Sequence, residues 1–177
     1  MTVLEAIYAR RSIRKYEDRP VEKEKLIELC RLGAAAPSAT NKRPWAFVVV
    51  DEPAQLKKVA AATMFGKFGA PAAIVVCGDL RRAVPLGKDF WIQDCAAAME
   101  NILLGATELG LGSVWIGITP IKPAMWAMRQ ALKLPRHMEP LGVAYLGYPA
   151  ETREPRTQLE DGMILWQQWK QADREDT

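Results

Sequence analysis

An arginine-rich segment near the N-terminus, Arg10–Arg14, carries the side chains best suited to chemistry. It places three guanidinium groups and the hydroxyl of Ser12 within five residues. Because arginine presents a planar fork of donors that matches phosphate oxygens and stays charged at any relevant pH, this segment could bind a terminal phosphate. A remaining guanidinium could face the electron-rich end of a ring system. The alternative is a solvated basic turn balanced by Glu17 and Asp18, and composition alone slightly favours that alternative.

The rest of the chain offers little machinery for acid–base, nucleophilic or metal chemistry. The one histidine, His137, is best interpreted as a surface or strand-edge residue, and no Gly-x-Ser-x-Gly elbow or Walker loop is present. One histidine and scattered cysteines give no metal-ligand cluster. Gly110 and Gly112 follow a predicted helix and precede a predicted strand, the reverse of the order in a dinucleotide fingerprint. If the chain is an enzyme, a bound cofactor must supply the reactive atoms.

Composition indicates a single globular domain over residues 1–177. The chain is 49% hydrophobic and 25% charged, and its net charge of +3 is too small to argue for a nucleic-acid or membrane partner. No apolar run reaches about 18 residues and the N-terminus lacks a signal-peptide pattern, so we expect a cytoplasmic protein. Cys30, Cys77 and Cys95 lie in separate apolar stretches and are expected to be reduced, buried thiols.

Hydrophobic periodicity predicts the elements that would position these groups. The first helix should begin with a capping box formed by Thr2 and Glu5. Helices are expected over residues 2–8, 20–36, from 53 onward, 89–109, 123–132 and 159–170, and strands over 45–50, 72–77, 113–116 and 141–147. The helices interleave with four strands, which indicates a mixed α and β class.

The helix predicted over 89–109 is apolar on more than one face. Trp91, Cys95 and Ile102 share one face, while Met99 and Leu103 occupy another. Such a helix is enclosed by more protein than one sheet provides. We therefore expect it at the centre of the molecule, where its small residues allow a second helix to approach closely.

Four segments resemble motifs of the FMN-dependent nitroreductase family. Residues 10–16 resemble its N-terminal flavin-phosphate motif, and residues 36–47 resemble its Ala-Pro-Ser-x-x-Asn-x-Gln-Pro-Trp-x-Phe segment. Residues 110–117 and 146–151 match two further motifs. The four matches follow the family's order and spacing and cover essentially the whole chain.

This resemblance implies an α+β sandwich in which a mainly antiparallel sheet is flanked by helices. It implies a homodimer with FMN at the subunit boundary, and reduction of small electron-poor acceptors, such as nitroaromatics or quinones, by NADH or NADPH in ping-pong turns. The flavin N5 atom would carry the chemistry, so no catalytic side chain and no metal are expected. Two alternatives remain: a specialised flavin enzyme of the same fold, such as a reductive dehalogenase, and a non-catalytic flavin-binding dimer.

The resemblance also implies roles for particular residues. Phosphate binding falls to the start of the motif, with Arg14 near the ribityl chain or the N1/O2 edge of the ring. The partner subunit would deliver Pro37, Ser38 and Asn41 to the flavin. Ile116 and Gly117 would lie by the ring, with a backbone N–H near the flavin N5 atom. The implied cofactor-binding residues are Arg10, Arg11, Ser12 and Arg14, then Pro37, Ser38 and Asn41 from the partner, then Ile116 and Gly117, and finally Arg156 as a late basic residue.

The chain departs from the family pattern at three places. Arg43 replaces the glutamine before Pro-Trp and could alter the charge of the pocket mouth. The late basic pair is reduced to Arg156, for which Arg153 could compensate. In the segment before the second strand only Lys67 is a candidate for the pyrimidine edge. The residues Trp91 and Trp126 are expected in the core, with a pocket wall as the alternative.

Overall fold

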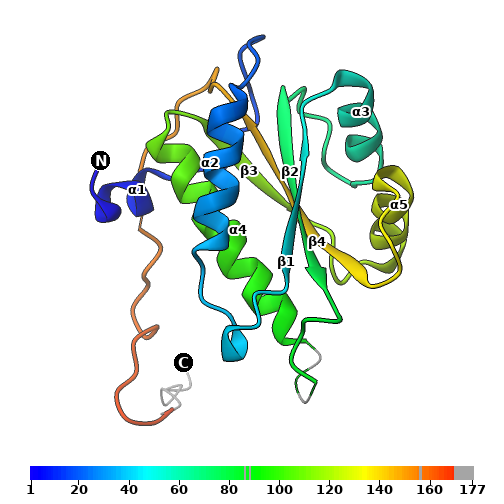
Figure 1. The fold of residues 1–177 in the computed structure, drawn as a ribbon. Coiled ribbons are helices and arrows are strands. Elements are labelled where there is room, and N and C mark those ends of the chain that lie inside the picture. The colour runs from blue at the N-terminus through cyan, green and yellow to red at the C-terminus, as the bar shows by residue number, and fades with distance from the viewer. Residues whose placement is uncertain (86, 88, 156, 170–177) are drawn as a thin grey trace, which may run out of the picture.

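The computed structural model describes residues 1–85, 87, 89–155 and 157–169, and its centre is a four-stranded antiparallel sheet. The strands are β1 (Trp45–Val50), β2 (Ala72–Asp79), β3 (Gly112–Gly117) and β4 (Met138–Gly147), in the order β1-β2-β4-β3 (Figure 1). Every residue of β2 is buried, as a central strand covered on both faces requires. The expected α+β fold with a mainly antiparallel sheet is confirmed.

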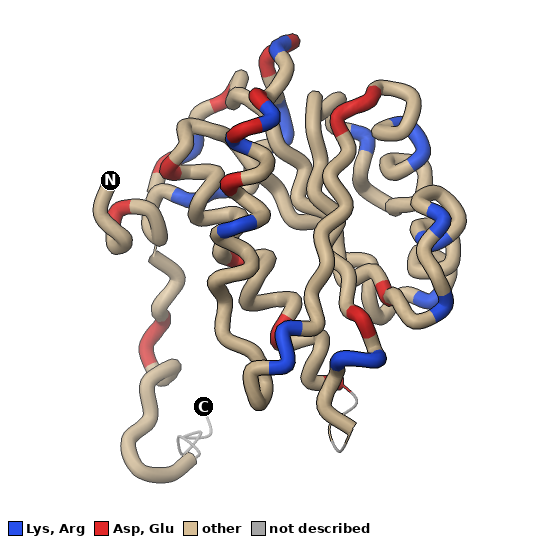
Figure 2. The backbone as a smooth tube through the Cα atoms, in the orientation of Figure 1, with Lys and Arg blue, Asp and Glu red and all other residues tan. Residues whose placement is uncertain are grey.

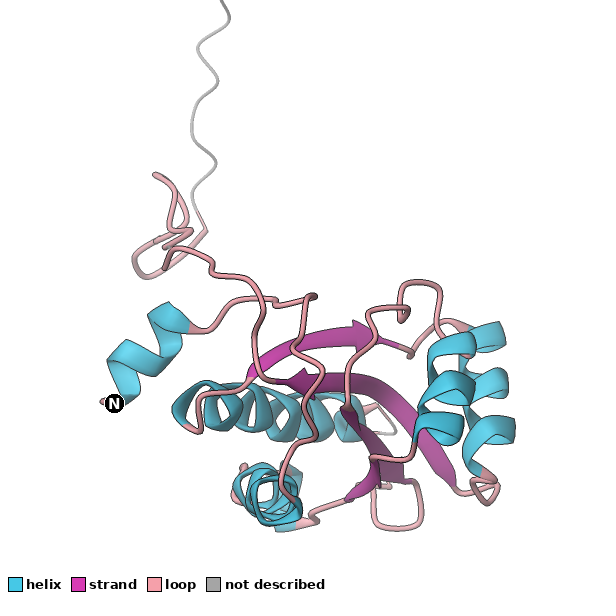
Figure 3. Cartoon of the chain, turned by 90° about the horizontal axis from the view of Figure 1, so that it is seen from above, coloured by secondary structure: helices cyan, strands magenta, loops and turns pink. Residues whose placement is uncertain are grey.

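Helices cover both faces of this sheet (Figures 1 and 3). One face packs against α2 (Lys23–Ala34) and α4 (Phe90–Glu108), and the other against α3 (Pro53–Ala61) and α5 (Lys122–Leu132). The short α1 (Val3–Ala9) lies beside α4, and a 3-10 turn, η1 (Ala39–Asn41), precedes β1. Charged residues lie on the helices and loops, whereas the strands between them are almost free of charge (Figure 2).

The predicted helix ends follow from their local chemistry. In α1 the hydroxyl of Thr2 accepts the Glu5 N–H at 3.2 Å, and the Glu5 carboxylate accepts the Thr2 N–H at 2.7 Å, so the capping box is confirmed. After α4 the chain turns at Gly110, whose φ of +72° lies in the region that favours glycine.

The central position predicted for the long helix is also confirmed. Met99 and Ile102 of α4 are fully buried, and α2 crosses the helix closely. A Cβ at Gly105 would lie 2.4 Å from Leu32 Cδ1, and a Cβ at Gly33 would lie 3.0 Å from Ile102 Cγ1. Small residues on both helices therefore allow the close approach that the sequence predicted.

The helix predicted over 159–170 is wrong for the described part, residues 159–169. These residues form turns and extended chain, interrupted at Gly162 by a φ of +85°, and they run away from the body of the domain (Figures 1 and 3). Leu159, Met163, Trp166 and Trp169 are spaced to share one face of a helix, but all four side chains are exposed, so the described chain offers that face no surface to pack against. The exposed large residues are Leu159, Met163, Ile164, Leu165, Trp166 and Trp169.

The tryptophans divide between core and surface. Trp91 is 5% exposed and packs in the core, as predicted. Trp126 is 66% exposed, so its expected core position is wrong: it occupies the outer side of α5, whose buried residues are Ala124 and Met128. No helix among the described residues is long and apolar enough to cross a bilayer.

Candidate functional site

The arginine-rich segment is held against the edge of the sheet beside β3. Ser12 pairs in parallel with Ser113, and the Ile13 N–H donates to the Ser113 carbonyl at 2.9 Å. The Tyr16 hydroxyl then donates back to the Ile13 carbonyl at 2.6 Å. Burial raises the pKa of Tyr16, so the phenol remains a hydrogen-bond donor at neutral pH. The segment is therefore a fixed part of the fold and not a loose basic turn.

Glu151 fixes the next residues of the same segment. One carboxylate oxygen accepts the backbone N–H groups of Arg14 at 2.7 Å and Lys15 at 3.2 Å, and the other pairs with Arg153 at 2.9 Å. These contacts, the Arg14 N–H first, hold the pKa of Glu151 below its usual value. Sequence reasoning placed Glu151 in a matching motif without a role, because nothing local reveals a partner 137 residues away.

Arg14 and Ile116, two predicted site residues, line one pocket of about 480 Å³. Lys67 lines it as well, and Met64, Phe65 and Phe68 supply an apolar wall. Gly117 follows Ile116 at an exposed point of the sheet edge, where an added Cβ would meet nothing within 4 Å. We call this the Arg14 pocket. It combines two cations with apolar surface, which suits a flat ring that carries negative charge along one edge.

The predicted phosphate residues lie at the start of the same segment. Arg10 Nε is 3.4 Å from Glu100 Oε1 on α4, so a bound phosphate would share or replace that ion pair. The Arg11 guanidinium donates to the backbone carbonyl of Glu154, which brings the late basic region next to the motif. Ser12 is half-buried beside them. Arg156 lies outside the described residues.

The segment containing Pro37, Ser38 and Asn41 does not line the Arg14 pocket. It is held at the beginning of α4, where the Ala39 N–H donates to Asp94 Oδ1 at 2.8 Å. Ser12, in contrast, pairs with Ser113, which follows the other end of α4. The chain on its own therefore does not bring the two predicted groups together.

This turn has a strained backbone. Thr40, Asn41 and Arg43 have φ values of +48°, +55° and +49°, in the left-handed region that side-chain-bearing residues rarely adopt. Such residues cost of order 1–3 kcal/mol each and persist only where surrounding contacts fix them. Here the Ser38 hydroxyl accepts the Arg43 N–H at 2.9 Å and the Asp94 carboxylate fixes Ala39.

Asp94 is a residue that sequence reasoning missed. It is 5% exposed, and a signal for it was present, because an acid lies on the apolar stripe of α4 between Trp91 and Ala98. Its Oδ2 atom is buried without a hydrogen-bond partner in the part of the chain that the structure describes.

Metal and thiol chemistry find no support. Within the ranges described above, no group of three or more His, Cys, Asp or Glu side chains could hold a metal ion. The three cysteines are free, and burial raises the pKa of Cys30 to about 11 and of Cys77 to about 12. Cys77 and Cys95 are buried as predicted, whereas Cys30 is only partly so.

A protein-family model and individual known proteins both match most of this chain. The Nitroreductase family model matches residues 7–66 and 61–148. A protein of Methanothermobacter thermautotrophicus, provisionally named NADH dehydrogenase/NAD(P)H nitroreductase, is 41% identical over 171 residues, which cover 96% of this chain and 88% of that protein.

Solved structures match over almost the whole chain. A crystal structure from Parabacteroides distasonis, with the same provisional name, is 40% identical with a TM-score of 0.88, over 94% of this chain and 98% of that one. A provisionally named nitroreductase from Desulfovibrio desulfuricans, solved in complex with FMN, is 31% identical with a TM-score of 0.80, over 97% and 99% of the two chains.

Proposed function

Because the chain belongs to the nitroreductase family, we propose that it is an FMN-dependent NAD(P)H oxidoreductase acting on small electron-poor acceptors such as nitroaromatics and quinones. The Arg14 pocket carries this proposal. It lies where the arginine motif meets the end of β3, and it offers cations and apolar wall in one place. A flavin ring needs both, since its body is apolar and its pyrimidine edge gains negative charge on reduction.

FMN, when bound, would supply the hydride-transfer chemistry that links NAD(P)H to the acceptor. The residues of this chain bind and orient the ring. Arg14 and Lys67 line this pocket and would place positive charge at the pyrimidine edge, where it would favour the reduced anionic form. Gly117 leaves the space above the end of β3 open, so that the ring can approach the backbone of Ile116 and Gly117.

The phosphate end of FMN is assigned to Arg10, Arg11 and Ser12, with Arg156 as the late basic residue. Ser12 pairs with Ser113 and Ile13 donates to the Ser113 carbonyl, so the backbone of the motif is fixed on β3 before a ligand binds. Charge-assisted contacts to phosphate oxygens are roughly twice as strong as neutral ones. A cytoplasmic location fits three unpaired thiols.

We assign Pro37, Ser38 and Asn41 to the flavin site of a second copy of the chain. They are separated from the Arg14 pocket of their own chain, and they sit on a rigid turn whose Pro37 and Asn41 are exposed. The exposed apolar side chains of α1, including Val3 and Leu4, supply a surface that a second copy would cover. A homodimer therefore completes the site.

Purified protein tests the enzymatic proposal directly. We expect yellow protein that bleaches with NADPH or NADH under anaerobic conditions and regains colour when a quinone or nitroaromatic is added. Initial rates should give parallel double-reciprocal lines, because donor and acceptor use one pocket in turn. Colourless protein that cannot be loaded with FMN would remove the proposal, and bound FMN that neither donor reduces would leave a flavin-binding dimer.

A further inference from the structure

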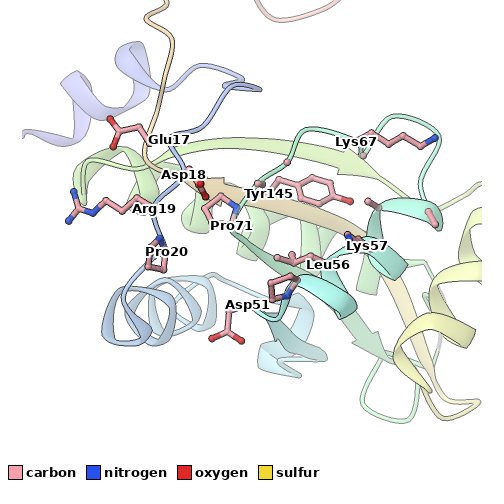
Figure 4. Close-up of a pocket in the computed structure, with 16 residues that line it drawn as sticks. Glu17, Asp18, Arg19, Pro20, Asp51, Leu56, Lys57, Lys67, Pro71 and Tyr145 are labelled. Atoms are coloured by element: carbon pink, nitrogen blue, oxygen red, sulfur yellow. The ribbon is translucent and has the colours of Figure 1, made fainter.

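We propose that a second cavity, separate from the Arg14 pocket, binds a small zwitterionic molecule with an apolar body, of about the size of a dipeptide. This α3 cavity has a volume of about 690 Å³ and lies between α3, the loop 17–20 and the segment 66–71 (Figure 4). Small-molecule sites typically measure about 300–1,000 Å³, so its size is suitable.

The α3 cavity and the Arg14 pocket lie on two sides of the same stretch of chain. Residues 64, 65 and 68 line the Arg14 pocket, residues 66, 69 and 70 line the α3 cavity, and Lys67 contributes to both. The α3 cavity is therefore a neighbour of the proposed flavin site and not part of it. A ligand in this cavity needs no contact with FMN.

The floor of the α3 cavity is apolar but carries one buried hydroxyl. Leu56, Ala60 and Pro71 line it together with the ring of Tyr145, which is 2% exposed. The Tyr145 hydroxyl has no hydrogen-bond partner of acceptable geometry among the described residues, and the nearby Thr63 hydroxyl donates to the Ala60 carbonyl at 3.0 Å. The phenol oxygen is itself fully enclosed, so the floor presents an apolar surface to a ligand.

Charges at the rim are separated by sign. Asp18 and Asp51 lie on one side of the cavity and Lys57 and Lys67 lie on the other, whereas the Glu17 carboxylate points away from the cavity (Figure 4). In the part of the chain that the structure describes, these five side chains make no ion pair with one another or with any other residue. The charges of Asp18, Asp51 and Lys57 therefore remain available to a ligand in this cavity, whereas Lys67 also lines the Arg14 pocket.

Arg19 lines the same cavity, but its charge is already engaged. Its guanidinium pairs with Glu22 at 3.2 Å and stacks over the Tyr148 ring at 3.8 Å, and it points away from the cavity (Figure 4). The acidic side consequently keeps its negative character.

The size of the cavity, its apolar floor and its oppositely charged sides together select one chemical class of ligand. An ammonium group would face the acidic side, a carboxylate would face Lys57, and an apolar body would cover Leu56 and the ring of Tyr145. A short peptide of apolar residues has these groups in this order. A ligand with a single charge leaves one side of the cavity unpaired.

Leucyl-leucine is a suitable probe, titrated calorimetrically into the purified full chain as it is isolated. We expect saturable binding of one molecule per chain. N-acetyl-leucyl-leucine and leucyl-leucine amide each lack one charge, and each should bind roughly three- to fivefold more weakly, as expected for the loss of one partly exposed ion pair.

Three pairs of similar residues in and around α3 supply matched variants and controls. In each pair one residue lines the cavity and the other does not. Asp51→Asn and Lys57→Gln should weaken binding, whereas Glu52→Gln and Lys58→Gln should leave it unchanged. Ala61→Trp should block the cavity, whereas Ala54→Trp on the exposed start of α3 should not.

Binding that follows these pairs supports the proposal, whatever the protein's redox activity proves to be. Absence of binding up to about 10 mM probe overturns it, including the case in which a second copy of the chain fills the cavity. Equal affinities within each pair, or equal affinities for the probe and its blocked forms, also overturn it.

Discussion

The Oδ1 atom of Asp94 accepts a hydrogen bond of 2.8 Å from the backbone N–H of Ala39, which ties the first turns of α4 to the turn that carries Ser38 and Asn41. The turn contains left-handed residues, and Asp94 is its buried anchor. Because Oδ2 has no partner among the described residues, the carboxylate has been buried at a cost that only this contact offsets.

Asp94→Ala should therefore weaken FMN binding although Asp94 lies outside the Arg14 pocket. A hydrogen bond to a charged group contributes roughly 1.5–3 kcal/mol, so the Kd for FMN should rise by at least about tenfold. Asp94→Asn keeps the acceptor atom and should stay within about threefold of the unchanged protein. Flavin fluorescence titration measures both, and equal affinities for the two variants would show that the anchor does not matter.

Arg10 and Arg43 should contribute unequally to FMN binding. Arg10 lies in the segment fixed on β3, and its loss should raise the Kd by roughly 10- to 100-fold, the effect of one charge-assisted phosphate contact. Arg43 is exposed and fixes its turn through a backbone N–H that alanine retains, so Arg43→Ala should change the Kd by less than about fivefold. Equal Kd values for the two variants would refute the phosphate assignment.

The elements that the sequence predicted correctly are those with a local signal. Strand β2 is a continuous apolar run, α1 has its capping box and α4 ends at a glycine. The prediction for the tail at 159–169 failed because its apolar residues, although spaced to share one helical face, have no surface of the described chain to cover. Helix propensity does not indicate whether the folded chain offers a surface against which an apolar helix face can pack.

The residues of the candidate site also divide into those with a local sequence signal and those without one. Arg14 and Ile116 belong to segments with recognisable patterns, and the structure places both in one pocket. Glu151 and Asp94 act on backbone N–H groups 137 and 55 residues away, and only the folded chain reveals such contacts. Sequence patterns predicted candidate ligand-binding groups, whereas the residues that fix the backbone around them could be found only in the structure.

Glu151 should make stability depend on pH in the acid range. Its folded pKa is lowered, so its contribution is fully present above the unfolded value of about 4.3 and is lost as pH falls through the folded value. Glu151→Gln should therefore have a lower Tm at neutral pH, and the difference from the unchanged protein should shrink below about pH 4. Glu52→Gln, whose carboxylate is exposed, serves as the control. A Tm difference that is constant with pH would contradict this account.

The three thiols should be unreactive in the native protein. Burial raises the pKa of Cys30 to about 11, that of Cys77 to about 12 and that of Cys95 higher still, so almost no thiolate exists near neutral pH. A disulfide reagent at about pH 8 should react slowly, with Cys30 first because it is the least buried, and all three should react at once in guanidinium chloride. A native thiol that reacts as fast as free cysteine would contradict these environments.

Gly78→Ala should destabilise the fold at the junction of β2 and α4. A Cβ at this position would lie 2.4 Å from Cε3 and 3.0 Å from Cδ2 of Trp91, closer than carbon atoms can approach. The indole is 5% exposed and packed in the core, so it cannot move aside freely, and overpacking of this kind costs roughly 1–3 kcal/mol. Gly117→Ala, where nothing lies within 4 Å, should change stability by less than about 0.5 kcal/mol. Denaturant unfolding of the two FMN-free variants, followed by circular dichroism, measures the difference. Equal unfolding midpoints would contradict the prediction, because they would mean that the Trp91 side chain can shift to make room for the added methyl group.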